Sequence, residues 1–137
     1  MIALATMALR NGLRQILLAD ANLVTRLGGS GKVYDEAPRN ADTPYIALGD
    51  VRTSDWSASD NAGCEHTLIL EVWSKHNGVA ECLEIAALVE HALATHPDAL
   101  AGYNLVLLRH ESTETSRRDR GRLSLCRMRY RALTDDL

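Results

Sequence analysis

The feature that most constrains the fold is an alternation of apolar residues and arginines near the C-terminal end of the chain. In an extended strand, successive side chains point to opposite faces of a sheet, so a period of two separates a buried set from a solvated set. The apolar set is Cys126, Met128, Tyr130 and Ala132, and the charged set is Arg127, Arg129 and Arg131. We therefore predict a strand over Leu123–Leu133 with one core face and one charged face.

Three other segments are rich in the β-branched, aromatic and aliphatic residues that favour strands. They are Tyr45–Trp56, Cys64–Lys75 and Tyr103–Glu114. The polar run Ser54–Gly63 separates the first two, and the turn Ser116–Gly121 precedes the arginine-bearing strand. This order predicts two long hairpins. Glu65 and Glu71 would face the arginines if their strands are neighbours.

Two segments have the spacing of amphipathic helices, Ile2–Ala19 and Val79–Thr95. The second has Asn77 or Gly78 as its cap region. Residues 20–27 show a weaker periodicity that fits a short extra turn, and the glycine-rich run 28–31 ends any helix there. The chain order is therefore helix, hairpin, helix, hairpin.

The leucines of the second helix do not all fall on one side. Projected at 100° per residue, Leu83 belongs to a broad apolar stripe, Ile85 lies at its edge, and Leu88 lies nearly opposite its centre. Leu88 is thus predicted to be exposed to solvent or covered by another chain.

These elements fit one domain that spans residues 1–137, because a chain of 137 residues with 46% hydrophobic residues can bury one core of ordinary size. We expect an α+β fold with a mostly antiparallel four-stranded sheet built from two long hairpins. Both main helices should pack on one face of that sheet.

Composition argues against several classes of protein. The formal net charge of −3 lacks the basic surplus of a nucleic-acid-binding domain. Cys64, Cys82 and Cys126 are odd in number and lie in apolar segments, which predicts buried thiols in a reducing compartment. The N-terminal segment is too interrupted for a signal peptide, and no apolar stretch suggests a membrane span. We expect a soluble protein that is made in a cytoplasm.

No pattern predicts a catalytic residue, a cofactor site or a metal site. Five histidines, His66, His76, His91, His96 and His110, lack the short spacings of zinc ligands. The aspartates lie in polar loops where solvated carboxylates are usual, and no arrangement supports a cysteine and histidine pair. The run 28–31 lacks the lysine of a phosphate-binding loop.

Two loops and one helix position are the candidate interface residues. The first loop carries Trp56, Ser57 and Asp60, and its indole either anchors a partner or folds back onto the core. The second turn carries the densest charge of the chain and either meets phosphates or is an ordinary solvated turn. The full set is Trp56, Ser57, Asp60, Leu88, Arg117, Arg118, Arg120 and Arg122.

Strand length gives a further argument. A strand of twelve to fourteen residues, at about 3.3 Å per residue, is longer than the diameter of roughly 35–40 Å of a compact domain of this size. The hairpin ends should therefore project from the domain. Long unpaired edges invite pairing between molecules. We therefore expect a ring or another closed homo-oligomer.

The order of several short motifs resembles the phage tail-completion, or tail-terminator, family. The resemblance covers nearly the entire chain, and it rests on order and spacing, since no single motif is diagnostic. The motifs are Val33-Tyr34-Asp35, Pro38, Thr43-Pro44-Tyr45-Ile46-Ala47-Leu48-Gly49, Gly63, Val72-Trp73-Ser74, Gly78 and Ala92-Leu93.

This resemblance implies a subunit of a hexameric ring that caps the tail tube of a phage or phage-like particle and joins it to the head connector. The implied partners are copies of the chain, the tail tube protein and the connector or stopper protein, with DNA passing through the lumen without sequence-specific binding. The 54–63 and 116–122 loops would contact tube or connector or line the DNA passage, and Leu88 and strand edges would form ring contacts. The alternatives are another neck, head-completion or minor tail subunit, and a small enzyme or ligand-binding domain.

Overall fold

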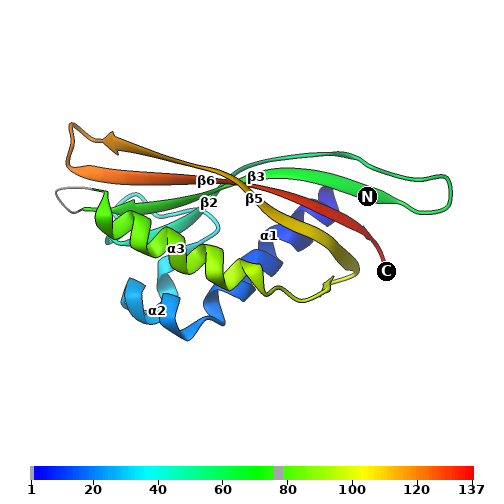
Figure 1. The fold of residues 1–137 in the computed structure, drawn as a ribbon, viewed down its shortest axis with the longest axis horizontal. Helices are drawn as coiled ribbons and strands as arrows, with labels where there is room; N and C mark the ends of the chain where they lie inside the picture. The colour runs from blue at the N-terminus through cyan, green and yellow to red at the C-terminus, as the bar shows by residue number, and fades with distance from the viewer. Residues whose placement is uncertain (1, 76–78) are drawn as a thin grey trace.

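The strand that carries the arginines lies in the middle of the sheet. The computed structural model describes residues 2–75 and 79–137, and within them six strands form one sheet in the order β1-β2-β3-β6-β5-β4 (Figure 1). The strands are β1 (Val33–Tyr34), β2 (Tyr45–Asp55), β3 (Gly63–Ser74), β4 (Ala99–Leu100), β5 (Tyr103–Arg118) and β6 (Leu123–Asp136). The helices are α1 (Ile2–Leu18), α2 (Ala21–Leu27) and α3 (Ala80–Ala94), with a short 3-10 helix η1 (Ser30–Lys32).

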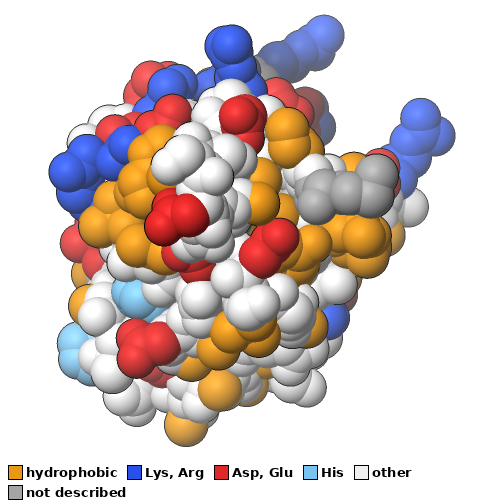
Figure 2. All heavy atoms as spheres, turned by 90° about the vertical axis from the view of Figure 1, so that its right-hand side faces the viewer, with side chains coloured by type: hydrophobic (Ala, Val, Ile, Leu, Met, Phe, Trp, Pro, Cys, Tyr) orange, Lys and Arg blue, Asp and Glu red, His pale blue; other side chains and the backbone are white. Residues whose placement is uncertain are grey.

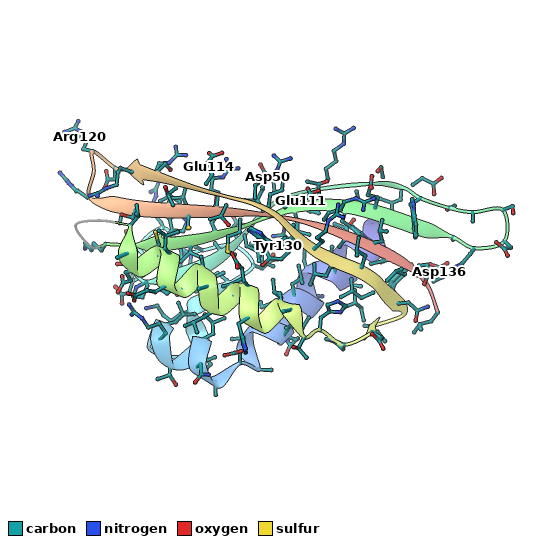
Figure 3. All side chains as sticks on the ribbon, in the orientation of Figure 1. Asp50, Glu111, Glu114, Arg120, Tyr130 and Asp136 are labelled. Carbon is teal, nitrogen blue, oxygen red and sulfur yellow. The ribbon has the colours of Figure 1, made fainter. Side chains whose placement is uncertain are left out.

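The alternation in β6 separates a buried face from a charged face, as predicted. Met128 and Tyr130 are buried against the helices, and Figure 3 shows Tyr130 on that side of the sheet. On the opposite face, Arg131 Nε donates to Glu65 Oε2 at 2.8 Å, and Arg127 Nε lies 3.9 Å from Glu71 Oε2. The predicted pairing of the β3 glutamates with the β6 arginines is therefore confirmed.

The expected four-stranded, mostly antiparallel sheet with two helices is wrong. The sheet has six strands and is mixed, because β1 runs parallel to β2 with Val33 opposite Ile46 and Tyr34 opposite Ala47. The two added strands, β1 and β4, have two residues each. A segment that short contains no measurable period, so only its tertiary pairing defines it as a strand.

A third helix, α2, lies where only a weak turn was expected. Asp20 caps its first turn, since its carboxylate accepts a hydrogen bond from Leu23 N at 2.9 Å. Gly28 has φ 89° and donates its N–H to the carbonyls of Val24 and Thr25, which ends the helix. The cap residues define this helix better than its apolar spacing does.

Helices α1 and α3 cover one face of the sheet and enclose the core (Figure 1). On α3, Ile85 is fully buried, Leu83 is 41% exposed, and Leu88 is half-buried against the core. The prediction that placed Leu83 in the buried stripe and Leu88 opposite it is therefore wrong. Since α3 contacts the sheet on one side and α1 and α2 on another, its buried arc is wider than one stripe.

The two long hairpins extend toward opposite ends of the molecule (Figure 1). The β2–β3 end lies beyond the helical layer on one side, and the β5–β6 turn lies at the other end. Strand β5 has 16 residues, and β4 pairs only with Tyr103 and Asn104. From Leu105 to Arg118, no strand of the described chain pairs with the outer edge of β5.

The opposite border of the sheet is different. Arg10 of α1 donates from Nη1 to the Gly49 carbonyl at 2.7 Å and from Nε to Asp35 Oδ1 at 3.0 Å. Thr6 of the same helix donates to Thr53 Oγ1 at 2.7 Å. Side chains of α1 therefore bind groups along β2 that lie near this border.

Candidate functional site

The turn between β5 and β6 places four arginines at one tip of the molecule. Gly121 N donates to Arg118 O, and Arg122 N donates to Asp119 O, both at 3.1 Å. Asp119, Arg120 and Gly121 have φ values of 51°, 57° and 81°, so three consecutive residues of the four-residue loop between Arg118 and Leu123 are in the left-handed region. The exposed arginines are Arg117, Arg118, Arg120 and Arg122.

The polar contacts of these arginines are with uncharged groups of the same hairpin. Arg117 donates to the Gly121 carbonyl at 2.6 Å, and Arg118 Nε donates to Ser116 Oγ at 3.1 Å. Within the ranges that the structure describes, no ion pair involves any of the four. The sequence predicted this cluster, and the hairpin brings it together.

The opposite tip holds the other predicted loop. Trp56 N donates to Gly63 O at 2.8 Å, and Ser57 Oγ donates to Asp55 Oδ1 at 2.5 Å. The indole is 45% exposed and lies against Gly63, where an added Cβ would be 3.0 Å from a ring carbon. Asp60 is exposed in the turn. Trp56 thus lies over the hairpin backbone and keeps an accessible face.

The C-terminal end of β6 adds carboxylates that the sequence reasoning missed. Asp135 accepts from Asn61 Nδ2 at 3.0 Å and from Asn104 Nδ2 at 2.8 Å, so it connects the loop to β5. Asp136 is exposed beside it, and its N–H donates to Ala62 O. Asn61 and Asp135 are 74 residues apart, and no local pattern indicates their contact.

This tip is therefore acidic as well as partly apolar. Figure 2 shows this end of the molecule, with acidic side chains between apolar surface. A hollow of about 520 Å³ lies here, and its walls include Asp55, Trp56, Asn61 and Asp135. None of the aspartates at this tip has an ion pair to a basic group in the described part of the chain.

Leu88, the remaining predicted interface residue, is not part of either tip. It lies on α3, half-buried against the core, and Leu83 is the more exposed leucine of that helix. The structure therefore brings the two loops to opposite ends and leaves Leu88 between them. Whether these residues contact partners stays a prediction.

The groups with strongly shifted pKa values belong to the core. Burial raises the pKa of the Cys126 thiol to about 12, and it also raises the pKa of Cys64 and of Cys82. All three cysteines are free and buried, as predicted. Burial lowers the pKa of His66 to about 4, and this ring is fully buried between Thr53 and Thr134. These shifts arise from removal of water around core side chains.

The histidines in the described part of the chain do not gather with other ligands. His110 Nε2 lies 2.6 Å from Thr113 Oγ1 and 3.8 Å from Glu90 Oε1, whereas His66 lies in the core. His76 and the expected cap residues Asn77 and Gly78 lie outside the described residues. In the ranges 2–75 and 79–137, no group of three His, Cys, Asp or Glu side chains has the geometry to hold a metal ion.

Among the helices described, none combines the length and apolar character needed to cross a membrane.

Comparison with known proteins gives one family. The family model of Tail completion protein gp17 matches residues 11–135. A solved structure described as the virion of a native gene transfer agent (GTA) particle contains a similar chain with a TM-score of 0.84. That chain is 28% identical, and the match covers 95% of this chain and 96% of that chain. No curated protein matches the chain. Because the family match extends from α1 to the end of β6, the chain belongs to the Tail completion protein gp17 family and is a phage tail structural subunit.

Proposed function

We propose that the chain is one subunit of a hexameric ring that terminates the tail tube of a tailed phage or phage-like particle and joins the tube to the head connector. The family match over residues 11–135 carries this proposal. The similarity to a chain of a gene transfer agent virion supports a place in a particle of that kind. The ring would assemble in the bacterial cytoplasm and act by assembly, without a catalytic step.

The shape of the subunit supports assembly with other chains. The outer edge of β5 from Val106 to Arg118 has no partner strand in the described chain, and long edges of this type invite pairing with another chain. Two charged tips at opposite ends add surfaces that can meet different neighbours. A ring would leave a lumen through which DNA passes without base-specific contacts, in keeping with the formal charge of −3.

Removal of the gene from a particle-producing strain tests this proposal. We expect heads and tails that do not join, and wild-type protein supplied in trans should restore joining. A reconstruction of the intact particle by electron microscopy should place six copies between tube and connector. Joined particles in the absence of the protein, or density for it elsewhere on the particle, would overturn the proposal in favour of another neck or minor tail subunit.

A further inference from the structure

Two of the three arginines on the outer face of β6 have carboxylate partners, whereas the charged side chains at the two ends of the sheet have none in the described chain. On the outer sheet face, Arg131 pairs with Glu65 and Arg127 with Glu71. The basic end carries Arg117, Arg118, Arg120 and Arg122. The acidic end carries Asp55, Asp60, Asp135 and Asp136. For these eight side chains the described chain provides no ion pair.

The two ends cannot neutralise each other within one copy. Figure 3 shows Arg120 at one end of the long axis and Asp136 toward the other. The basic end also contains one carboxylate, Asp119, and keeps an excess of positive charge, whereas the acidic end has an excess of negative charge. The opposite sign is present on the same chain, at the far end, and therefore on the neighbouring surface of any copy that is added end to end.

The backbone of the basic tip also indicates a role for its side chains. Arg120 has φ 57°, a conformation that costs a residue with a Cβ about 1 kcal/mol and costs glycine very little. An arginine at this position is therefore not explained by the geometry of the turn. Its side chain points away from the molecule at the extreme tip (Figure 3).

We propose that the arginine tip of one copy docks onto the acidic end of the next copy. This contact rests on the proposed function, because it would join the subunits of the ring. The contact is heterologous, since it uses two different surfaces, and such contacts close into rings when the rotation between copies is suitable. Guanidinium groups bind carboxylates through two parallel hydrogen bonds, which gives the contact direction as well as strength.

The acidic end has a hollow and charges that suit the arginine tip of another copy. Its hollow of about 520 Å³ has Asp55 and Asp135 in its walls together with Trp56. The accessible face of the indole offers a stacking surface for a guanidinium group. The two tips are then partners of each other, which differs from the tube or connector contact expected from the sequence.

Cross-linking inside assembled particles tests the proposal. A chain that carries both Arg120→Cys and Asp60→Cys is treated with a short bis-maleimide, and the products are separated under denaturing conditions. We expect a ladder of covalent multimers, because each copy then links to two neighbours. Each single variant and the wild type should stay monomeric, since the native cysteines are buried.

Two results separate this inference from the proposed function. Monomers only, in particles where electron microscopy places the subunit at the end of the tail tube, would overturn the docking contact and leave the function intact. Dimers from Arg120→Cys alone would overturn it as well, because they would place two basic tips together. Absence of the subunit from the tail end would overturn the proposed function itself.

A charge exchange distinguishes a second copy from DNA as the partner of the arginines. The variants Arg120→Glu with Arg122→Glu, and Asp60→Lys with Asp136→Lys, should each lower the number of joined particles by roughly tenfold or more, since like charges at an interface are strongly unfavourable. The chain with all four changes should recover joining, because its ends are complementary again. Failure to recover, in a variant with the thermal stability of the wild type, would favour contact with phosphates and overturn the proposal.

Discussion

His66 Nε2 lies 2.9 Å from Thr134 Oγ1, in the interior between the sheet and α1. The other ring nitrogen lies 2.9 Å from Thr53 Oγ1, and Thr53 in turn accepts a hydrogen bond from Thr6 of α1. Strands β2, β3 and β6 and the first helix thus meet at one neutral imidazole.

This imidazole predicts acid sensitivity. Burial lowers the pKa of His66 to about 4, below its unfolded value of about 6.5, so the folded state binds fewer protons than the unfolded state between these values. The stabilisation is complete above pH 6.5 and is lost as the pH falls toward 4, by up to about 3 kcal/mol. Urea unfolding from pH 7 to pH 4 measures this loss.

Two substitutions serve as controls for the acid effect. His66→Gln should show a smaller loss of unfolding free energy between pH 7 and pH 4 than the wild type, although it is less stable at pH 7. His91→Gln, at an exposed position, should follow the wild-type curve. If the unfolding free energy of His66→Gln fell with pH as steeply as that of the wild type, carboxylates alone would cause the acid sensitivity.

The orientation of α3 predicts unequal costs for neighbouring truncations. Ile85→Ala removes a fully buried side chain and should lower the free energy of unfolding by about 2–4 kcal/mol. Leu83→Ala removes one that is 41% exposed and should change it by less than about 1 kcal/mol. Chemical denaturation of both variants provides the comparison, and equal losses would contradict the observed rotation of the helix.

The cap of α2 predicts a local effect. Asp20→Ala removes the acceptor for Leu23 N and should cost about 1 kcal/mol of stability. Asp20→Asn keeps a side-chain oxygen and should cost much less. Thermal unfolding of the two variants tests this, and an equal loss in both would mean that the charge of Asp20, and not its hydrogen bond, stabilises the helix.

The ion pair between Arg131 and Glu65 predicts a modest coupling. Both side chains are partly exposed, at 28% and 38%, so solvent screens the pair, and a double-mutant cycle to alanine should give about 0.5–1 kcal/mol. The same cycle with Arg129 in place of Arg131 should give a value near zero, since Arg129 has no ion pair in the described chain. Equal coupling energies in the two cycles would show that the arginines act through the overall charge of this sheet face and not through one specific ion pair.

The β5–β6 turn predicts a substitution that stabilises the fold. Arg120→Gly removes the Cβ from a residue with φ 57° and should raise the free energy of unfolding by about 0.5–1 kcal/mol. Arg122→Gly, outside the left-handed region, should give no gain. Urea denaturation measures both changes. A loss of stability in Arg120→Gly would show that its side chain supports the turn.

The long periodic elements were predictable from the sequence because each one buries a single face. The alternation in β6 placed Tyr130 in the core and Arg131 outside it, and it paired Arg131 with Glu65. The Arg120 turn was also recognisable, since a polar run between two strands is a local signal. The alternation and the turn are local patterns of a few residues, and the pairing of Arg131 with Glu65 follows once their strands are neighbours.

The features that the sequence did not predict depend on contacts between distant segments. Strand β1 exists because Val33 lies opposite Ile46, and neither residue shows a period of its own. The rotation of α3 follows from packing against the sheet and against other helices at once. The acidic end forms because Asp135 joins Asn61 and Asn104. These contacts between distant segments are fixed by the topology of the whole sheet.

The difference between the two borders of the sheet limits how these molecules can aggregate. A strand from another chain can add along β5, where Val106–Arg118 has no paired strand in the described chain, whereas Arg10 of α1 already binds the Gly49 carbonyl of β2. A β5 strand of another copy that added at β2 would therefore have to displace Arg10 from the Gly49 carbonyl. The subunit thus keeps one long open strand, while the repeated addition at both borders that builds amyloid-like fibres is hindered at β2.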